Sequence, residues 1–338
     1  MLTRAGYRPI ESLAVGDLVL THRGRWRRVV ETMRRDGAAV RRVGAGGVPG
    51  LVTTDEHPFY ARRVALRWDN TRRRYVRSFE APAWIEASAL RGVFVSQVLP
   101  HVGRDRRTVE FWWLVGRYLA DGWCVDRRGR PGRGRVVVCA KRGPESDDLS
   151  ARIRAAGYNA TLVEDRTANK FHITKSDLYQ FVQPFGRLAH GKTITGDVLG
   201  LDRARAAALL DGLLSGDGYI GKRGERRLTT VSKALALGAA LLAQRAYGVV
   251  AGVRCCRMPA TKYIEGRLVR QRDFWIVSVP PRNRSAFVEG RYGWKLTRRS
   301  EPCNACATVY NIAVEQDESY VADGAVVHNC QPASVAGK

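Results

Sequence analysis

Two stretches of this sequence match each other and decide the fold, LVGRYLADG at residues 114–122 and LDGLLSGDG at residues 210–218. Apolar residues spaced as on one face of an α-helix predict helices over residues 111–120 and 203–216. Each stretch ends in Asp-Gly, and the two aspartates, Asp121 and Asp217, lie 96 positions apart (217 − 121 = 96). Because this spacing is about one small domain, it indicates an internal duplication.

Each predicted helix has a glycine in its middle, Gly116 in the first and Gly212 in the second. Glycine inside a helix costs about 1 kcal/mol relative to alanine, and close backbone contact between the two helices would account for that cost. Helices packed through these glycines would bring Asp121 and Asp217 together at their C-terminal ends. Two adjacent carboxylates favour a hard divalent cation. The alternative is two ordinary core helices, each followed by an Asp-Gly turn.

The chain carries a large excess of positive charge, +25 over 338 residues. A polyanion is the expected partner, and nucleic acid is favoured over a membrane because no basic amphipathic helix with an aromatic face stands out. The sequence has no apolar run long enough for a membrane span and no secretory leader at its start. Seven cysteines without a leader favour free thiols in a reducing compartment, so we expect a cytoplasmic protein.

Residues 1–100 and 301–330 read as β-structure, whereas the middle of the chain carries the clear helices. A chain of this length also predicts more than one domain. We therefore expect an α+β, multidomain protein in which an all-β module is interrupted by the duplicated helical segment.

The tail holds a second candidate site, the run VVHNC at residues 326–330. The side-chain amide of Asn329 can attack its own main-chain carbonyl, form a succinimide and release the chain that follows. His328 is placed to act as the general acid for the departing amide, and the thiol of Cys330 is a good acyl acceptor. By itself, such a triplet could also occur by chance.

The paired segments resemble the two LAGLIDADG motifs of homing endonucleases, and the flanking β segments resemble the Hint protein-splicing module of inteins. The Hint resemblance rests on the segments at residues 6–13, 53–60 and 84–90. The endonuclease resemblance implies two αββαββα-type repeats related by a pseudo-twofold axis. It also implies double-stranded DNA as the substrate, bound along the major groove, and Mg²⁺ held by Asp121 and Asp217.

The resemblance implies further site residues. Lys192, 71 residues after Asp121, and Lys295, 78 residues after Asp217, match the lysine that the endonucleases carry near the metal. Each would steady the attacking water or the charge on the phosphate, and the alternative for each is a phosphate contact or a surface charge. In the Hint module, the Thr-x-x-His pattern of Thr54 and His57 polarises the peptide bond at the front of the intein.

The resemblance divides the chain into a Hint part at residues 1–100, LAGLIDADG repeats at 101–200 and 201–300, and a second Hint part at 301–329. Residues 330–338 would then begin the host (extein) segment. The chain departs from the Hint pattern because no nucleophile precedes Leu2, and because Asn311 and Glu318 replace an acid and a histidine that are usual there. We therefore expect the splicing module to perform at most Asn329 cyclisation and C-terminal cleavage.

The favoured hypothesis is a monomeric, intein-borne endonuclease that makes Mg²⁺-dependent, site-specific double-strand cuts in DNA. An alternative is a self-processing Hint module with a decayed nuclease that binds DNA without cutting it. A third is a plain basic DNA-binding protein, against which the two aspartates count. Four cysteines, Cys255, Cys256, Cys303 and Cys306, could hold zinc, but a single Cys-x-x-Cys pair favours free thiols.

Overall fold

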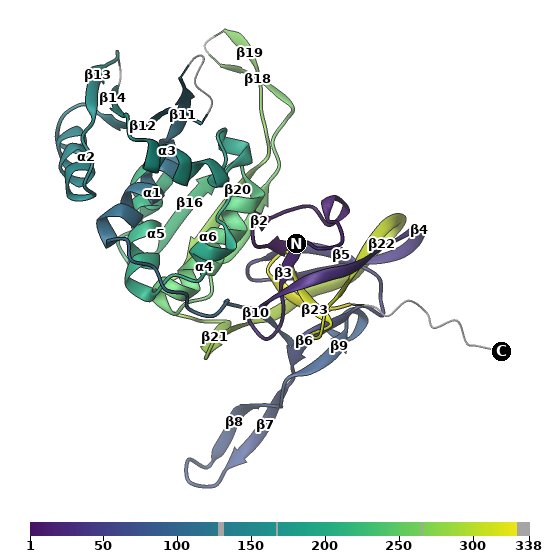
Figure 1. Cartoon of the computed structure of the whole chain (residues 1–338). Coiled ribbons are helices and arrows are strands. Elements are labelled where there is room, and N and C mark those ends of the chain that lie inside the picture. The colour runs from purple at the N-terminus through teal and green to yellow at the C-terminus, as the bar shows by residue number, and fades with distance from the viewer. Residues whose placement is uncertain (128–131, 167, 265, 330–338) are drawn as a thin grey trace. The chain divides into compact units, whose positions relative to one another are not determined.

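The computed structural model describes residues 1–127, 132–166, 168–264 and 266–329, and it consists of two compact units (Figure 1). The first unit combines Met1–His101 with the chain from Arg282 onward, and the second is Val102–Pro281. All six α-helices of the described residues lie in the second unit, whereas the described part of the first contains strands and two short 3₁₀-helices. The prediction of a chain with both helical and β structure is confirmed.

An antiparallel sheet of twelve strands forms the first unit, in the order β2-β1-β3-β4-β22-β10-β6-β24-β23 with β5 beside β4, β9 beside β6 and β21 beside β22. β7 and β8 form a separate two-stranded ribbon. The elements are β1 (Leu2–Thr3), β2 (Gly6–Tyr7), η1 (Ile10–Ser12), β3 (Leu18–Leu20), β4 (Trp26–Ala45), β5 (Val48–Thr53), β6 (Pro58–Arg62), β7 (Val64–Asp69), β8 (Arg74–Phe79), β9 (Ala83–Glu86), η2 (Ala87–Ala89), β10 (Phe94–Val98), β21 (Ala286–Glu289), β22 (Tyr292–Val314), β23 (Ser319–Ala322) and β24 (Ala325–His328).

The core of the first unit is shared between segments far apart in the sequence. Val19, Phe59 and Val95 from the early strands are buried in the same cluster as Ile312 and Val327 from the late ones. Burying each such side chain contributes about 1.5–3 kcal/mol. The pairing of β24 with β6, in which Val327 faces Phe59, places the tail of the chain beside the segment that contains the Thr-x-x-His pattern.

The described part of the second unit contains two four-stranded antiparallel sheets, a two-stranded ribbon and six α-helices. Its first half is α1 (Val109–Asp121), β11 (Trp123–Asp126), β12 (Gly134–Lys141), α2 (Pro144–Ala155), β13 (Thr161–Glu164), β14 (Ala168–Ile173), α3 (Ser176–Val182), η3 (Gln183–Phe185), η4 (Ala189–Gly191) and α4 (Gly196–Leu199). Its second half is α5 (Arg203–Asp217), β15 (Gly218–Ile220), β16 (Arg226–Thr230), α6 (Lys233–Tyr247), β17 (Gly252–Cys256), β18 (Thr261–Ile264), β19 (Arg267–Arg270) and β20 (Phe274–Val279).

The two halves have the same topology. Each begins with the helix that carries the repeated motif, continues with a hairpin and a second helix, and ends with two more strands of the sheet. In each sheet, the last of the four strands in sequence lies between the second and the third. The sheet orders β11-β12-β14-β13 and β15-β16-β20-β17 are therefore equivalent. The second half differs by the inserted β18–β19 hairpin between its third and fourth strands. This shared order agrees with the duplication inferred from the two aspartates.

The domain boundaries differ from those predicted from the sequence. The second repeat was placed at 201–300, but the compact unit ends at Pro281 and residues 282–300 belong to the first unit. A boundary at 300 would cut through β22, a single 23-residue strand that pairs with β10 near its start and with β4 over the rest of its length. The predicted host segment at 330–338 lies outside the described residues.

Replacing Gly116 by alanine tests the helix packing described below. Alanine is the better helix former by about 1 kcal/mol, but its β-carbon would collide with backbone atoms of α5. We expect Gly116→Ala to lower the free energy of unfolding of the second unit by about 1–3 kcal/mol in calorimetric or urea unfolding. Gly191→Ala is the control, because a β-carbon there meets no atom within 4 Å. Equal stability of the two variants would contradict close packing.

Candidate functional site

Each of the two motif helices begins at a capping side chain and ends at an aspartate. Thr108 caps α1 by accepting a hydrogen bond from the backbone nitrogen three residues on (3.2 Å), and Asp202 caps α5 in the same way (3.0 Å). α1 then ends at Asp121 and α5 at Asp217. The helices predicted from apolar periodicity are therefore present, with their aspartates in the last turn.

The two helices lie side by side and touch through their glycines (Figure 1). Gly116 packs against the backbone of α5, and Gly212 against that of α1, so closely that a β-carbon at either position would collide with a carbonyl oxygen. Nearer the ends, a β-carbon on Gly216 would lie 2.5 Å from Oδ2 of Asp121. The prediction that glycines allow close approach is confirmed, and the carboxylate of Asp121 rests against the last turn of α5.

The pKa of Asp217 reflects both its burial and the neighbouring acid. Desolvation by the surrounding protein and the negative charge of Asp121 raise the pKa of Asp217 to about 6, although Lys192 and Arg117 act in the opposite direction. Asp217 nevertheless keeps solvent exposure. An ionised pair of this kind is repulsive on its own, so a bound cation would stabilise it.

Lys192 lies beside the acid pair. Its side chain is buried, and Nζ donates to the carbonyl oxygens of Tyr118 (2.8 Å) and Ala120 (2.9 Å) at the C-terminal end of α1, where a positive charge is favourable. Desolvation lowers the pKa of Lys192 to about 8, although both aspartates oppose that change. Its own carbonyl accepts a hydrogen bond from Ser232, the N-cap of α6, which fixes this segment in place (2.6 Å).

The structure adds a residue that the sequence reasoning missed. Arg117 is almost fully buried, and its Nη2 lies 3.2 Å from Oδ2 of Asp121 and 2.9 Å from Oε1 of Glu145. The available signal was its position four residues before Asp121, because side chains one helical turn apart face the same side.

The donor set fits a divalent cation that is completed by its substrate. No group of three or more His, Cys, Asp or Glu residues placed to hold a metal occurs among the described residues. Asp121 and Asp217 supply two carboxylates at the ends of adjoining helices. Mg²⁺ is commonly held by one or two carboxylates together with phosphate oxygens and water. The pair therefore fits a divalent cation whose coordination is completed by phosphate oxygens and water.

Lys295 is not part of this site, and its predicted equivalence to Lys192 is wrong. It belongs to β22 in the first unit, where its side chain is fully buried and Nζ donates to the carbonyl of Gly324 (2.9 Å). This burial lowers the pKa of Lys295 to about 7. The number of residues after Asp217 did not identify an equivalent lysine, because the β18–β19 hairpin lengthens the second half and because the chain leaves the second unit after Pro281.

In the first unit, Thr54 and His57 lie in the turn between β5 and β6, and both are buried. The backbone nitrogen of His57 donates to the carbonyl of Thr54 (3.4 Å). Burial lowers the pKa of His57 to about 4, opposed by Glu56 and assisted by the charge of His328. The Thr-x-x-His pair and the His-Asn pair of the tail are therefore brought to the same region of the sheet.

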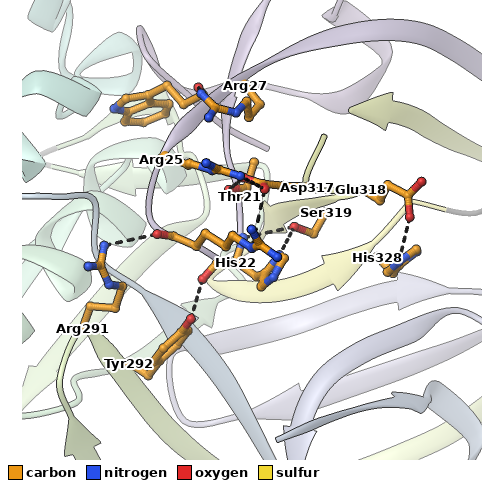
Figure 2. Close-up of polar contacts among 12 residues, drawn as sticks. Thr21, His22, Arg25, Arg27, Arg291, Tyr292, Asp317, Glu318, Ser319 and His328 are labelled. Carbon is orange, nitrogen blue, oxygen red and sulfur yellow. Dashed lines mark hydrogen bonds and ion pairs between the residues drawn. The ribbon is translucent and has the colours of Figure 1, made fainter. Parts of the chain in front are cut away.

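At the end of β24, His328 contacts the main-chain carbonyl group of Asn329. Its Nδ1 lies 2.5 Å from the main-chain oxygen of Asn329. Figure 2 shows the contact on the other side of the ring, where Nε2 lies 3.8 Å from Oε2 of Glu318. The ring of Trp84 packs edge-on against the imidazole. Asn329 is buried, and its side-chain oxygen has no hydrogen-bond partner among the described residues. Cys330 lies outside the described residues.

A buried carboxylate anchors the segment that carries Glu318 (Figure 2). Burial by itself would raise the pKa of Asp317, but hydrogen bonds from Arg25 and Thr21 lower it to about 2. The same two segments are also in contact through neighbouring residues, since Nδ1 of His22 lies 2.7 Å from Oγ of Ser319. These bonds tie the β3–β4 turn to the start of β23 and so hold the loop that faces His328.

The cysteines named as a possible zinc set are divided between the two units. Cys255 and Cys256 lie on β17 in the second unit, whereas Cys303 and Cys306 lie on β22 in the first. All four are free thiols.

The raised pKa of Asp217 predicts a pH dependence of stability. Because the folded state binds this proton more tightly than an unfolded aspartate, Asp217 favours folding most at low pH, and that contribution is lost as the pH rises through about 6. Without divalent ions, the Tm of the wild-type second unit should therefore fall relative to Asp217→Asn between about pH 4 and pH 7. Asp148→Asn, at an exposed carboxylate on α2, should keep the wild-type dependence. Parallel curves for wild type and Asp217→Asn would contradict the assignment.

No helix among the described residues is long and apolar enough to cross a membrane.

No protein family model matches the chain. The chain is 27% identical over 360 residues to iron-sulfur cluster assembly SufBD family proteins of Mycobacterium bovis and Mycobacterium tuberculosis, covering 96% of this chain and 41% of theirs. It is 24% identical over 405 residues to the ATP-dependent DNA helicase Hel308 of Thermococcus kodakarensis, covering 97% of this chain and 35% of the helicase. The chain thus spans about two fifths, or less, of these relatives.

Similar solved structures are LAGLIDADG proteins. Variants of the homing endonuclease I-DmoI share 13% sequence identity with this chain at a TM-score of 0.36, over 51% of this chain and 88% of theirs. I-DmoI has also been solved with DNA and Mn, and with DNA and Ca. The N-terminal LAGLIDADG domain of DUF199/WhiA shares 13% identity at a TM-score of 0.30, over 52% of this chain and 78% of that domain. Structural similarity to LAGLIDADG proteins therefore covers about half of the chain.

Proposed function

We propose that the second unit is a LAGLIDADG-type endonuclease that hydrolyses double-stranded DNA with the help of Mg²⁺. The observation that carries this proposal is the acid pair, in which two helices of a duplicated fold touch through Gly116 and Gly212 and end at Asp121 and Asp217. A close backbone contact between two helices can be explained by the stability of the fold. Two aspartates held together at the end of that contact, one of them with a raised pKa, do not stabilise the fold, so they point to a function.

The residues of the site divide the chemistry between them. Asp121 and Asp217 would hold Mg²⁺ together with phosphate oxygens of the DNA, and the ion would supply an activated water and neutralise developing charge. Lys192 holds a positive charge beside the carboxylates, fixed by two carbonyl oxygens, where it can stabilise negative charge on a phosphate. Both aspartates come from one chain, so we propose that a monomer contains the complete site.

Duplex DNA is the partner that the charges favour. Arginines at exposed positions lie on strands of both sheets of the second unit, including Arg135 on β12, Arg227 on β16 and Arg254 on β17. On β16, Arg227 and Thr229 are exposed whereas Leu228 and Thr230 are buried, so one face of this sheet packs on the protein and the other is open. An open, basic face made of strands is suited to phosphate contacts and to the major groove.

We propose as a second activity that the first unit is a Hint module that cleaves the chain after Asn329. Nδ2 of Asn329 would attack the main-chain carbonyl carbon of the same residue, the bond to residue 330 would break, and the departing nitrogen would take up a proton. We assign His328 as the acid for the departing nitrogen. Its Nδ1 lies 2.5 Å from the carbonyl oxygen of Asn329, where it can also donate a hydrogen bond to the negative charge that develops there. The residues after Asn329 would then be the host segment.

The alignments with curated proteins support this second proposal. Nearly all of this chain aligns with a minor part of two proteins whose names describe unrelated activities, an iron-sulfur assembly family protein and a DNA helicase. A segment shared by proteins of different activity is the pattern expected of an element inserted into different hosts, as an intein is.

Neutralising either aspartate tests the nuclease. We expect Asp121→Asn and Asp217→Asn each to lower the cleavage rate at least about 100-fold, measured with Mg²⁺ on duplex targets selected from a random library. DNA affinity, measured by fluorescence anisotropy, should stay within a few-fold of wild type. Asp148→Asn, an equal change of charge on α2, should cut normally. Full nicking by the double aspartate variant would refute the metal site, and a wild type that binds but never cuts would favour a decayed nuclease.

Mass spectrometry of the purified chain tests the splicing module. Incubation should convert the chain to a product that ends at Asn329 as a succinimide, with release of residues 330–338. Asn329→Ala should abolish this release, and His328→Ala should slow it by about 10²-fold or more, because it removes the general acid. Asn304→Ala, at an exposed position on β22, is the control and should behave as wild type. Release from Asn329→Ala at the wild-type rate would exclude cyclisation.

A further inference from the structure

Beside the acid pair lies a positive charge that the duplicated motif does not require. Arg117 is 3% exposed, and its guanidinium lies between α1, α5, α2 and β12. Nη1 donates to Ser215 Oγ (3.2 Å), whereas Nη2 donates to the carbonyl of Cys139 (2.5 Å) and to Oε1 of Glu145 (2.9 Å). The same Nη2 lies 3.2 Å from Oδ2 of Asp121.

The second half of the unit has no such charge at the equivalent position. Arg117 and Leu213 each follow the packing glycine of their helix, and they are separated by the same 96 positions as the two aspartates (213 − 117 = 96). Leu213 is fully buried and apolar. Asp121 therefore has an arginine one turn before it on its own helix, whereas Asp217 has a leucine there.

A purely structural role does not account for the arginine. Burying a guanidinium costs free energy unless all of its donors are satisfied, and Nε of Arg117 has no hydrogen-bond partner among the described residues. Leucine at the equivalent position packs the same helix pair without that cost. What leucine does not provide is a positive charge on one carboxylate of the pair.

We propose that Arg117 is a positioning residue that makes the two acids unequal as metal ligands. Its charge neutralises Asp121 and holds the carboxylate in place before any cation binds. A divalent cation therefore binds mainly through Asp217, and it binds weakly until phosphate oxygens complete its coordination. The inference deepens the proposed function and rests on the acid pair being its metal site. It predicts that the free protein discriminates between its two aspartates, which a symmetric pair would not do.

Mn²⁺ binding without DNA tests the proposal, followed by the loss of the free-ion EPR signal. In the wild type, we expect Asp217→Asn to weaken binding at least about tenfold and Asp121→Asn to weaken it less than about threefold. Arg117→Met, which keeps the length of the side chain without its charge, should tighten Mn²⁺ binding about tenfold or more, because it removes a unit charge next to the ligand. In the Arg117→Met background, Asp121→Asn should then cost as much as Asp217→Asn.

Two further variants separate charge from packing. Arg117→Lys keeps the positive charge and should bind Mn²⁺ within about threefold of wild type. Glu145→Gln leaves Asp121 as the only anion beside Arg117 and should weaken Mn²⁺ binding more than Asp147→Asn, which removes a charge from the same turn of α2, whereas the loss of a charge alone predicts similar effects of the two variants. These two variants keep the test decisive if Arg117→Met fails to show a cooperative thermal transition.

The outcomes distinguish this inference from the proposed function. Tighter Mn²⁺ binding by Arg117→Met supports the inference, even if the wild-type chain never cuts DNA and the nuclease proposal fails. Unchanged or weaker binding by a folded Arg117→Met overturns the inference, even if the wild type cuts DNA normally. Equal losses for the two single aspartate variants in the wild-type background would also overturn it.

Discussion

The second unit depends on one contact, the backbone-to-backbone approach of α1 and α5 at Gly116 and Gly212. Without a β-carbon on either residue, each helix can rest against a carbonyl of the other. The helix axes come close enough that their C-terminal ends meet, and two aspartates share one region. A larger residue at either position would separate the ends of the helices. The same contact therefore sets both the packing of the unit and the geometry of its acids.

Two adjacent carboxylates repel each other, and the surrounding residues reduce this repulsion in different ways. Lys192 supplies a positive charge from outside the helix pair and is held by carbonyls at the end of α1. Arg117 supplies another from within α1, shared with Glu145. Asp217 has no arginine at the equivalent place, and desolvation together with the negative charge of Asp121 raises its pKa. The fold is duplicated, but the charges around its acids are not.

The sequence predicted the parts of the site that depend on local pattern. Apolar spacing located both helices, the repeated Asp-Gly located both acids, and the glycines indicated close packing. The resemblance to the endonucleases implied Lys192, and the same argument failed for Lys295, because a hairpin insertion and the exit of the chain at Pro281 changed what lies at the matching distance. Counting positions is reliable only while two repeats keep the same elements.

The sequence by itself therefore determined the duplicated helices, their aspartates and the His328–Asn329 pair, because each is a local pattern of residue types. Only the tertiary structure decided that residues 282–300 belong to the first unit, that Lys295 is a buried structural lysine and that Arg117 contacts Asp121. The position of Glu318 beside His328 was decided in the same way. Such facts depend on contacts between segments distant in the chain, and these contacts arise from strand pairing and burial that no short stretch of sequence encodes.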